Sequence, residues 1–230
     1  MWWRSTLEWT RMLNVSDTRL AQQAYEQILD LIVSGQALPN ALVNERRLAE
    51  RLNMSRTPIR DALLMLESEG LLVRQGNRGL QVRQMRVEDF IGNLQIRLLL
   101  EPEAARIAAG RIRHADLDDL ARDLRAILET AAIGGAAVER DVVRSVDDRL
   151  HRSIAEATGN EQLASIIQTL RRQTQMFDLK SVPERLHDTC DEHLAILAAV
   201  KAGDGDAACA AMREHLEKVR QSIITHLSRF

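Results

Sequence analysis

The sequence has few aromatic residues, prolines, glycines and cysteines. Among its 230 residues are only 3 Trp, 1 Tyr and 3 Phe, together with 4 Pro and 11 Gly. This composition argues against collagen-like, disordered and small all-β chains, because each of those classes depends on residues that are scarce here. Helix-forming and small apolar residues dominate instead, and the length allows one large domain or two modest ones, each with a core.

Two further absences concern the cellular compartment. The chain has 2 Cys, Cys190 and Cys209, and no secretory signal pattern, so we expect a cytoplasmic protein without a disulfide framework. No apolar run approaches the ~18 residues of a membrane helix, so we expect no membrane partner. All three Trp lie within residues 1–17, which we interpret as an N-terminal extension, with a docking tail as the alternative.

The sequence also lacks a strong net charge, although its charges are unevenly distributed. The formal net charge is −2, which by itself argues against nucleic-acid binding. Between Asn44 and Arg83, however, eight Arg stand against five acidic residues, while all six His lie beyond residue 84. This local excess of Arg leaves DNA binding open for the N-terminal part of the chain.

The first 83 residues show the pattern of a winged helix-turn-helix. Apolar residues at helical spacing predict three helices, the last two joined by a tight turn, and two short strands follow. Asn44 and Ser55 stand where side chains cap the second and third helices. The predicted elements are helices Thr18–Val33, Glu45–Leu52 and Arg56–Glu69 and strands Leu71–Arg74 and Leu80–Arg83.

Beyond a linker at residues 84–87, the sequence shows only helical patterns, separated by glycine-containing turns such as Gly134-Gly135. Six helices, with seven as the alternative, indicate an antiparallel all-α bundle over residues 88–230. The predicted fold class is therefore mainly α, with a winged helix-turn-helix at residues 18–83. The predicted bundle helices are 88–109, 115–132, 137–157, 160–178, 184–202 and 205–228.

Arginines occupy the positions at which a helix-turn-helix contacts DNA. Arg56, Thr57 and Arg60 open the third predicted helix, whose N-terminus faces base edges in such motifs. An arginine can bind guanine through two parallel hydrogen bonds. Arg46 opens the preceding helix, where a backbone phosphate would lie. The alternative for each is an ordinary solvated arginine.

Four strings in this region form a long and specific pattern. They are Asn44-Glu45-Arg46-Arg47-Leu48-Ala49-Glu50-Arg51-Leu52, Ser55-Arg56-Thr57-Pro58-Ile59-Arg60-Asp61-Ala62-Leu63, Leu66-Glu67-Ser68-Glu69-Gly70-Leu71 and Arg78-Gly79-Leu80-Gln81-Val82. With them, residues 18–83 resemble the DNA-binding domain of the GntR family of bacterial transcription regulators. The resemblance implies that Arg46, Arg56 and Arg60 contact operator DNA and that the wing residues Gly76, Asn77 and Arg78 enter its minor groove. We expect a short palindromic operator as the partner, with Ser55 and Thr57 as further candidate contacts.

One position departs from this family. Asn40 stands where the family usually has glycine after the proline. Asparagine tolerates left-handed backbone angles better than most residues, so we expect the turn to be preserved.

One aspartate and three histidines have spacings that allow them to meet. Asp147 and His151 are four residues apart on one predicted helix and therefore share a face. His193 and His215 each lie 11 residues from Asp204, which centres the turn between the last two helices. At ~1.5 Å per residue both are about 16 Å from that turn. One carboxylate and three imidazoles suit Zn²⁺, Ni²⁺, Mn²⁺ or Fe²⁺, with unrelated surface or core histidines as the alternative.

The second half of the chain carries a further set of strings, namely Asp147-Asp148-Arg149-Leu150-His151, Ala157-Thr158-Gly159-Asn160, Glu192-His193-Leu194-Ala195-Ile196-Leu197 and His215-Leu216. With them, residues 88–228 resemble the helical FCD effector domain of the FadR subfamily of GntR regulators. The resemblance implies that Asp147, His151, His193 and His215 hold a divalent metal, zinc foremost, at the floor of a ligand cavity. The acyl-CoA-binding branch lacks this set of four, so an acyl-CoA effector is not expected.

Arg97 is the candidate for binding the effector. It lies on the first helix of the predicted bundle and could pair with the carboxylate of a small organic acid at the metal. The alternative is an intrahelical pair with Glu101, four residues further on. Cys190, three residues before His193, is a less favoured thiolate ligand, because a free cysteine is commonly a small buried apolar residue.

Together these features predict a homodimeric transcription regulator, a repressor in preference to an activator, that responds to a small carboxylate metabolite. The predicted metal set has no neighbouring general base or nucleophile, so we expect no enzymatic activity. The alternatives are a metal-dependent enzyme acting on a small acid, with the winged domain as an accessory, and a purely architectural DNA-binding protein.

Overall fold

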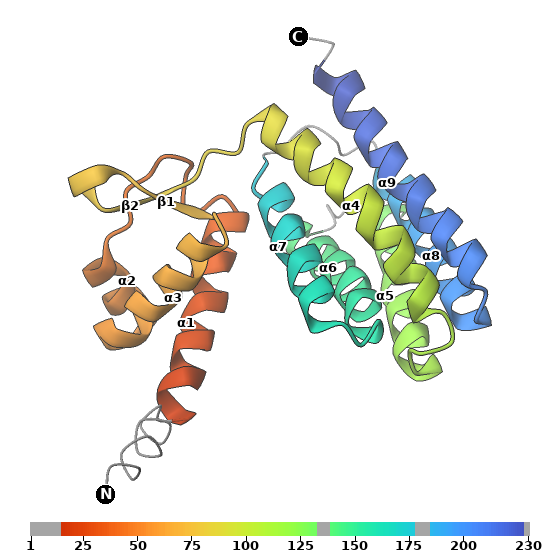
Figure 1. The fold of residues 1–230 in the computed structure, drawn as a ribbon, viewed down its shortest axis with the longest axis horizontal. Coiled ribbons are helices and arrows are strands. Elements are labelled where there is room, and N and C mark those ends of the chain that lie inside the picture. The colour runs from red at the N-terminus through yellow and green to blue at the C-terminus, as the bar shows by residue number, and fades with distance from the viewer. Residues whose placement is uncertain (1–14, 133–138, 178–184, 228–230) are drawn as a thin grey trace, which may run out of the picture. The chain divides into compact units, whose positions relative to one another are not determined.

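The computed structural model describes residues 15–132, 139–177 and 185–227. The chain divides into two compact units, Met1–Met85 and Arg86–Phe230, and each is described by itself (Figure 1). The three Trp and the separator Gly134-Gly135 lie outside the described residues, whereas residues 15–17 of the predicted extension belong to the first helix. The elements confirm the predicted, mainly α fold class.

The N-terminal unit is a winged helix-turn-helix. Strands β1 and β2 form an antiparallel hairpin in which Leu72 pairs with Val82, and an isolated bridge between Leu42 and Gln81 joins the segment before α2 to this hairpin. A 3₁₀ turn, which the sequence pattern did not predict, forms the tip of the wing. The elements are α1 (Val15–Val33), α2 (Glu45–Leu52), α3 (Arg56–Ser68), β1 (Leu72–Arg74), η2 (Gly76–Arg78) and β2 (Leu80–Val82).

Asparagines determine three local features of this unit. The Asn44 side chain accepts a hydrogen bond from the Arg47 N–H and caps α2, as predicted. Asn40 and Asn53 have positive φ angles of 64° and 51°, so Asn40 does adopt the left-handed conformation at the expected turn. Ser55 occupies the N-cap position of α3, but its side chain makes no capping hydrogen bond, so the predicted capping role of Ser55 is wrong.

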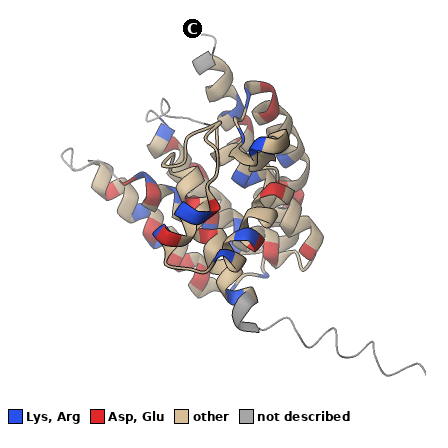
Figure 2. Ribbon diagram, turned by 90° about the vertical axis from the view of Figure 1, so that its left-hand side faces the viewer, with Lys and Arg blue, Asp and Glu red and all other residues tan. Residues whose placement is uncertain are grey.

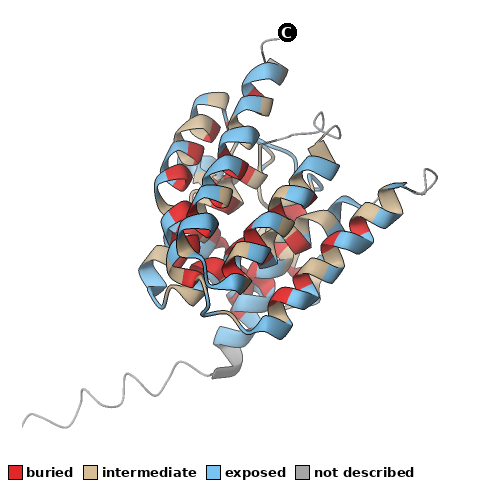
Figure 3. Cartoon of the chain, turned by 90° about the vertical axis from the view of Figure 1, so that its right-hand side faces the viewer, coloured by how far each residue is buried: buried red, intermediate tan, exposed pale blue. Residues whose placement is uncertain are grey.

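The described part of the C-terminal unit is a bundle of six helices. Helix α4 contacts α6, α7, α8 and α9, which makes it the central helix. The buried residues line the inner faces of the helices (Figure 3), and α4 continues through Pro102 as one helix. The helices are α4 (Val87–Ala108), α5 (His114–Ala132), α6 (Arg140–Ala157), α7 (Glu161–Gln175), α8 (Leu186–Ala202) and α9 (Gly205–Leu227).

The distribution of charged residues along the chain agrees with the small net charge. Lys and Arg are interspersed with Asp and Glu along the helices (Figure 2). Across the described ranges, no helix is long and apolar enough to span a bilayer.

Candidate metal centre and DNA-reading surface

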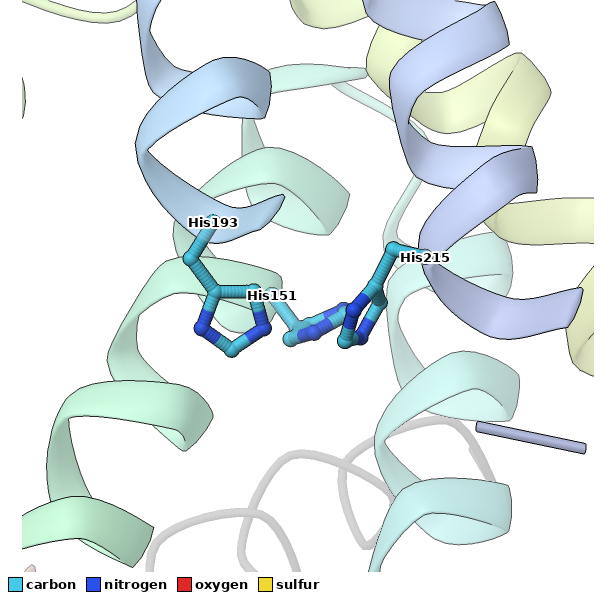
Figure 4. A group of neighbouring side chains, drawn as sticks. All are labelled: His151, His193 and His215. Carbon is cyan, nitrogen blue, oxygen red and sulfur yellow. The ribbon is translucent and has the colours of Figure 1, made fainter. Parts of the chain in front are cut away.

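Three buried histidines from three helices meet inside the bundle. His151 lies on α6, His193 on α8 and His215 on α9, and each is at most 3% exposed. One ring nitrogen from each lies within 4.8 Å of the other two (Figure 4). The structure therefore brings together the three histidines that the sequence analysis names as candidate metal ligands.

The turn between α8 and α9 explains why His193 and His215 face each other. Gly203 ends α8 with a left-handed φ of 72°, and the Asp204 side chain accepts a hydrogen bond from the Ala207 N–H at the start of α9. Because the chain reverses at this tight turn, residues equally far from it lie at the same level of the two helices.

Asp147 adds a carboxylate to the three histidines. Its Oδ1 atom lies 3.5 Å from His193 Nε2 and 3.8 Å from His151 Nε2. Its Oδ2 atom accepts a hydrogen bond of 2.6 Å from the Arg171 guanidinium. One carboxylate oxygen thus faces the histidines while the other binds Arg171. All four predicted ligands therefore form one cluster.

The donors of this cluster fit a divalent metal ion. The Nε2 atoms of His151 and His193 are buried and, among the described residues, have no hydrogen-bond partner. A buried polar atom without a partner costs free energy, and in native proteins such an atom calls for an explanation. Three imidazoles and a carboxylate are a common ligand set of zinc and related divalent metals, and binding would satisfy these nitrogens.

The electrostatics favour the protonation states that bind metals. Burial, together with the Arg171 charge, lowers the pKa of His151 to about 4, and burial beside His215 places the pKa of His193 well below its usual range. Burial alone would raise the pKa of Asp147, but Arg171 and the histidines outweigh it and hold that pKa well below its usual range. The cluster at neutral pH therefore has neutral His151 and His193 beside an ionised Asp147, as metal binding requires.

We predict that the metal-free protein loses stability between pH 6.5 and about pH 4. In this window the unfolded chain takes up protons at positions 151 and 193 that the folded chain does not, so acidification favours unfolding. Thermal unfolding in the presence of a chelator should show a melting temperature that falls by several degrees across this range. His151→Gln should flatten the profile and His114→Gln, which changes an exposed histidine, should not; a flat wild-type profile would contradict the prediction.

Arg97, the predicted effector-binding residue, is buried on α4. Its Nε donates to Glu101 Oε1 at 2.5 Å, and its NH1 donates to Thr174 Oγ1 at 3.1 Å. The intrahelical pair that the sequence allowed as the alternative is therefore formed, and contact of Arg97 with an effector stays a prediction.

Arg171 is a site residue that sequence reasoning missed. Its side chain is 3% exposed, it holds Asp147, and its Nε is a buried donor without a partner in the described ranges. The sequence does contain a signal, because Ala164, Ile167, Arg171 and Thr174 recur at helical spacing. The structure shows that all four are buried. An arginine on the apolar face of a predicted helix is unusual, because charged residues are rarely buried without a partner.

Cys190, the alternative thiolate ligand, is a poor metal donor in this structure. Burial raises the pKa of the Cys190 thiol to about 11, which opposes the thiolate-ligand alternative. His114 and His187 are exposed. The side chain of His226 lies outside the described residues.

The predicted DNA contacts lie on exposed parts of the N-terminal unit. At the start of α3, Thr57 is exposed, and Glu45 Oε2 lies 3.6 Å from Arg56 and 3.1 Å from Arg60. Because one carboxylate contacts both guanidinium groups, the two arginines lie side by side. The remaining predicted contacts, Arg46, Ser55, Gly76, Asn77 and Arg78, are also exposed, and the wing residues among them form η2.

Both units match known families, and the whole chain has relatives. The model described as "Bacterial regulatory proteins, gntR family" matches residues 20–82, and that of the FCD domain matches residues 93–218. The "Probable D-xylose utilization operon transcriptional repressor" of Paenarthrobacter nicotinovorans is 30% identical over 200 residues, 86% of each chain. The "Uxu operon transcriptional regulator" of Escherichia coli is 32% identical over 233 residues, 89% of this chain and 88% of the relative.

Solved structures support the fold. The structure described as "E. coli McbR/YncC" has a TM-score of 0.77 at 22% identity, covering 90% of this chain and 98% of that one. A GntR-type regulator from Rhodococcus has a TM-score of 0.69 at 22% identity, covering 89% and 97%.

Proposed function

Because the chain belongs to the gntR family of bacterial regulatory proteins and carries an FCD domain, we propose that it is a homodimeric repressor that senses a small carboxylate at a divalent metal site. The cluster of three buried histidines, His151, His193 and His215, with the partly exposed Asp147 carries this proposal. Transcription regulation itself follows from the family, whose relatives here are named as regulators and repressors and not as enzymes. In this proposal residues 18–83 bind DNA, and residues 88–230 sense the ligand and dimerise.

The polar side chains around the cluster support an anionic ligand. Asp147 and the three histidines would hold the metal, which when bound would offer a positive site to a carboxylate oxygen. Arg171 and Arg97 contribute buried guanidinium groups beside the cluster, and the Nε of Arg171 has no acceptor among the residues that the structure describes. Guanidinium groups bind carboxylates with strong, directional hydrogen bonds.

Control of DNA binding requires that the effector distinguish two states of the protein. An effector shifts the balance between DNA-bound and free repressor only by the difference in its affinity for them. The two winged helix-turn-helix units of a symmetric dimer would match a palindromic operator. In this proposal, a rearrangement of the bundle changes the distance between these two units. Light scattering of the purified protein should give twice the chain mass, and a monomeric mass at micromolar concentration would refute the homodimer.

A thermal-shift screen of small organic acids tests the sensing role. The library should hold dicarboxylates, hydroxy acids and sugar acids, with D-xylose included because one relative is named for its utilization. A ligand present at a hundredfold excess over its Kd adds about 2.7 kcal/mol of stability, which raises the melting temperature of a protein of this size by about 5–10 °C.

The shift should require both metal and Arg97. Chelation or Arg97→Gln should abolish the shift, and Arg122→Gln, at an exposed position on α5, should preserve it. Shifts of equal size with and without metal would contradict a metal-dependent sensor.

A further inference from the structure

Two of the three histidines bind the carboxylate of a glutamate through their Nδ1 atoms. His151 Nδ1 is 2.5 Å from Glu101 Oε2, and His215 Nδ1 is 2.8 Å from Glu192 Oε2. The side chains of Glu101 and Glu192 are 3% and 8% exposed. Neither glutamate belongs to the set of four ligands predicted from the sequence.

Each glutamate also binds an arginine through its second oxygen. Glu101 Oε1 accepts from Arg97 Nε at 2.5 Å, and Glu192 Oε1 accepts from the Arg185 guanidinium at 2.6 Å. The same arrangement of arginine, glutamate and histidine therefore occurs twice, once between α4 and α6 and once between α8 and α9. Such repetition on unrelated helices indicates a role in the cluster that both arrangements share.

The arginines determine what the glutamates can do. Each carboxylate is paired with a guanidinium group, Glu101 with Arg97 at 2.5 Å and Glu192 with Arg185 at 2.6 Å, and an adjacent positive charge favours the ionised form of a carboxyl group. An ionised carboxylate can only accept a hydrogen bond. The histidine must then donate from Nδ1, and its neutral ring carries the free lone pair on Nε2. For His151, Nε2 faces Asp147 and has no hydrogen-bond partner in the part of the chain that the structure describes.

We propose that Glu101 and Glu192 are positioning residues that orient His151 and His215 and fix their tautomers, so that Nε2 of each ring binds the metal. This inference rests on the proposed metal site. A carboxylate behind a ligating imidazole also makes its lone pair a stronger donor, and loss of such a partner typically weakens metal binding 10–100-fold.

Metal affinity of the full-length protein is the direct measurement. Zn²⁺ competition with a chromogenic chelator should show 10–100-fold weaker binding for Glu101→Gln and for Glu192→Gln, with helical circular dichroism unchanged. Glu214→Gln is the matched control, because Glu214 precedes His215 on α9, carries the same charge and is 65% exposed in a pair with Lys218. The control should bind Zn²⁺ as the wild type does, and equal weakening by all three variants would overturn the proposal.

A double-mutant cycle separates positioning from a purely structural ion pair. In a His215→Ala background, Glu192→Gln should have no further effect on Zn²⁺ affinity, because the ring that it orients is gone, while Glu101→Gln should still weaken binding. Equal effects of Glu192→Gln in the wild-type and His215→Ala backgrounds would overturn the positioning role. If Glu192→Gln fails to fold, Glu101→Gln in wild-type and His151→Ala backgrounds provides the same test on the other arrangement.

Different results would refute the metal site and the positioning role of the glutamates. A wild-type chain that binds neither Zn²⁺ nor Co²⁺ would refute the metal site and, with it, this inference. A wild-type chain that binds Zn²⁺ tightly, with unchanged affinity in both glutamate variants, would refute the positioning role alone.

Discussion

Replacing His193 and His215 together by alanine should abolish metal binding and leave a folded helical bundle. The change removes two of the three imidazoles and leaves Asp147 and His151 as the remaining donors, too few for tight binding of zinc or a related ion. Elemental analysis of the purified variant should show metal content falling from about one ion per chain to near zero, as expected for a site with four protein ligands.

The fold should persist because little else depends on these two rings. His193 carries a buried Nε2 that has no hydrogen-bond partner within residues 15–132, 139–177 and 185–227, so its removal also removes an unsatisfied polar atom. Glu192, which loses His215, still binds Arg185. The matched control is His114→Ala with His187→Ala, which removes two exposed imidazoles and should retain full metal content. Full metal content in the His193 and His215 variant would remove both from the site.

The second large effect is expected on the affinity for specific DNA. Arg56→Ala combined with Arg60→Ala should weaken binding to a specific duplex by about 10²–10⁴-fold, because each well-formed arginine–guanine pair contributes about 1–3 kcal/mol. The pairs of both arginines with Glu45 are exposed and worth at most about 1 kcal/mol, so they do not prevent the side chains from reaching bases.

Gel shifts with a duplex selected from a random pool by the wild-type protein provide the measurement. Arg122→Ala with Arg125→Ala is the control, since it removes the same charge from exposed positions on α5 and should leave the affinity for the selected duplex unchanged. The Arg56 and Arg60 variant should keep its metal content. An unchanged gel shift would exclude these two arginines from base reading.

Local sequence patterns determined the helices, the wing and most of the candidate DNA contacts. A helix-turn-helix is built from neighbouring segments, so the capping of α2 by Asn44 and the placement of Arg56 and Arg60 at the start of α3 follow from short spacings. The two pairs among the candidate metal ligands also follow from short spacings. Asp147 and His151 share one helix, and His193 and His215 share one antiparallel pair, so both relations depend on local geometry.

Tertiary structure decided which side chains surround that cluster. Arg171 reaches Asp147 from 24 residues away, and Glu101 reaches His151 from 50 residues away on a different helix. Periodicity shows which face of a helix is buried, but the rotation and level at which two faces meet depend on the packing of all six helices in the described bundle. For this reason the sequence alone named the four candidate ligands, and only the packed bundle revealed the arginines and glutamates that hold them.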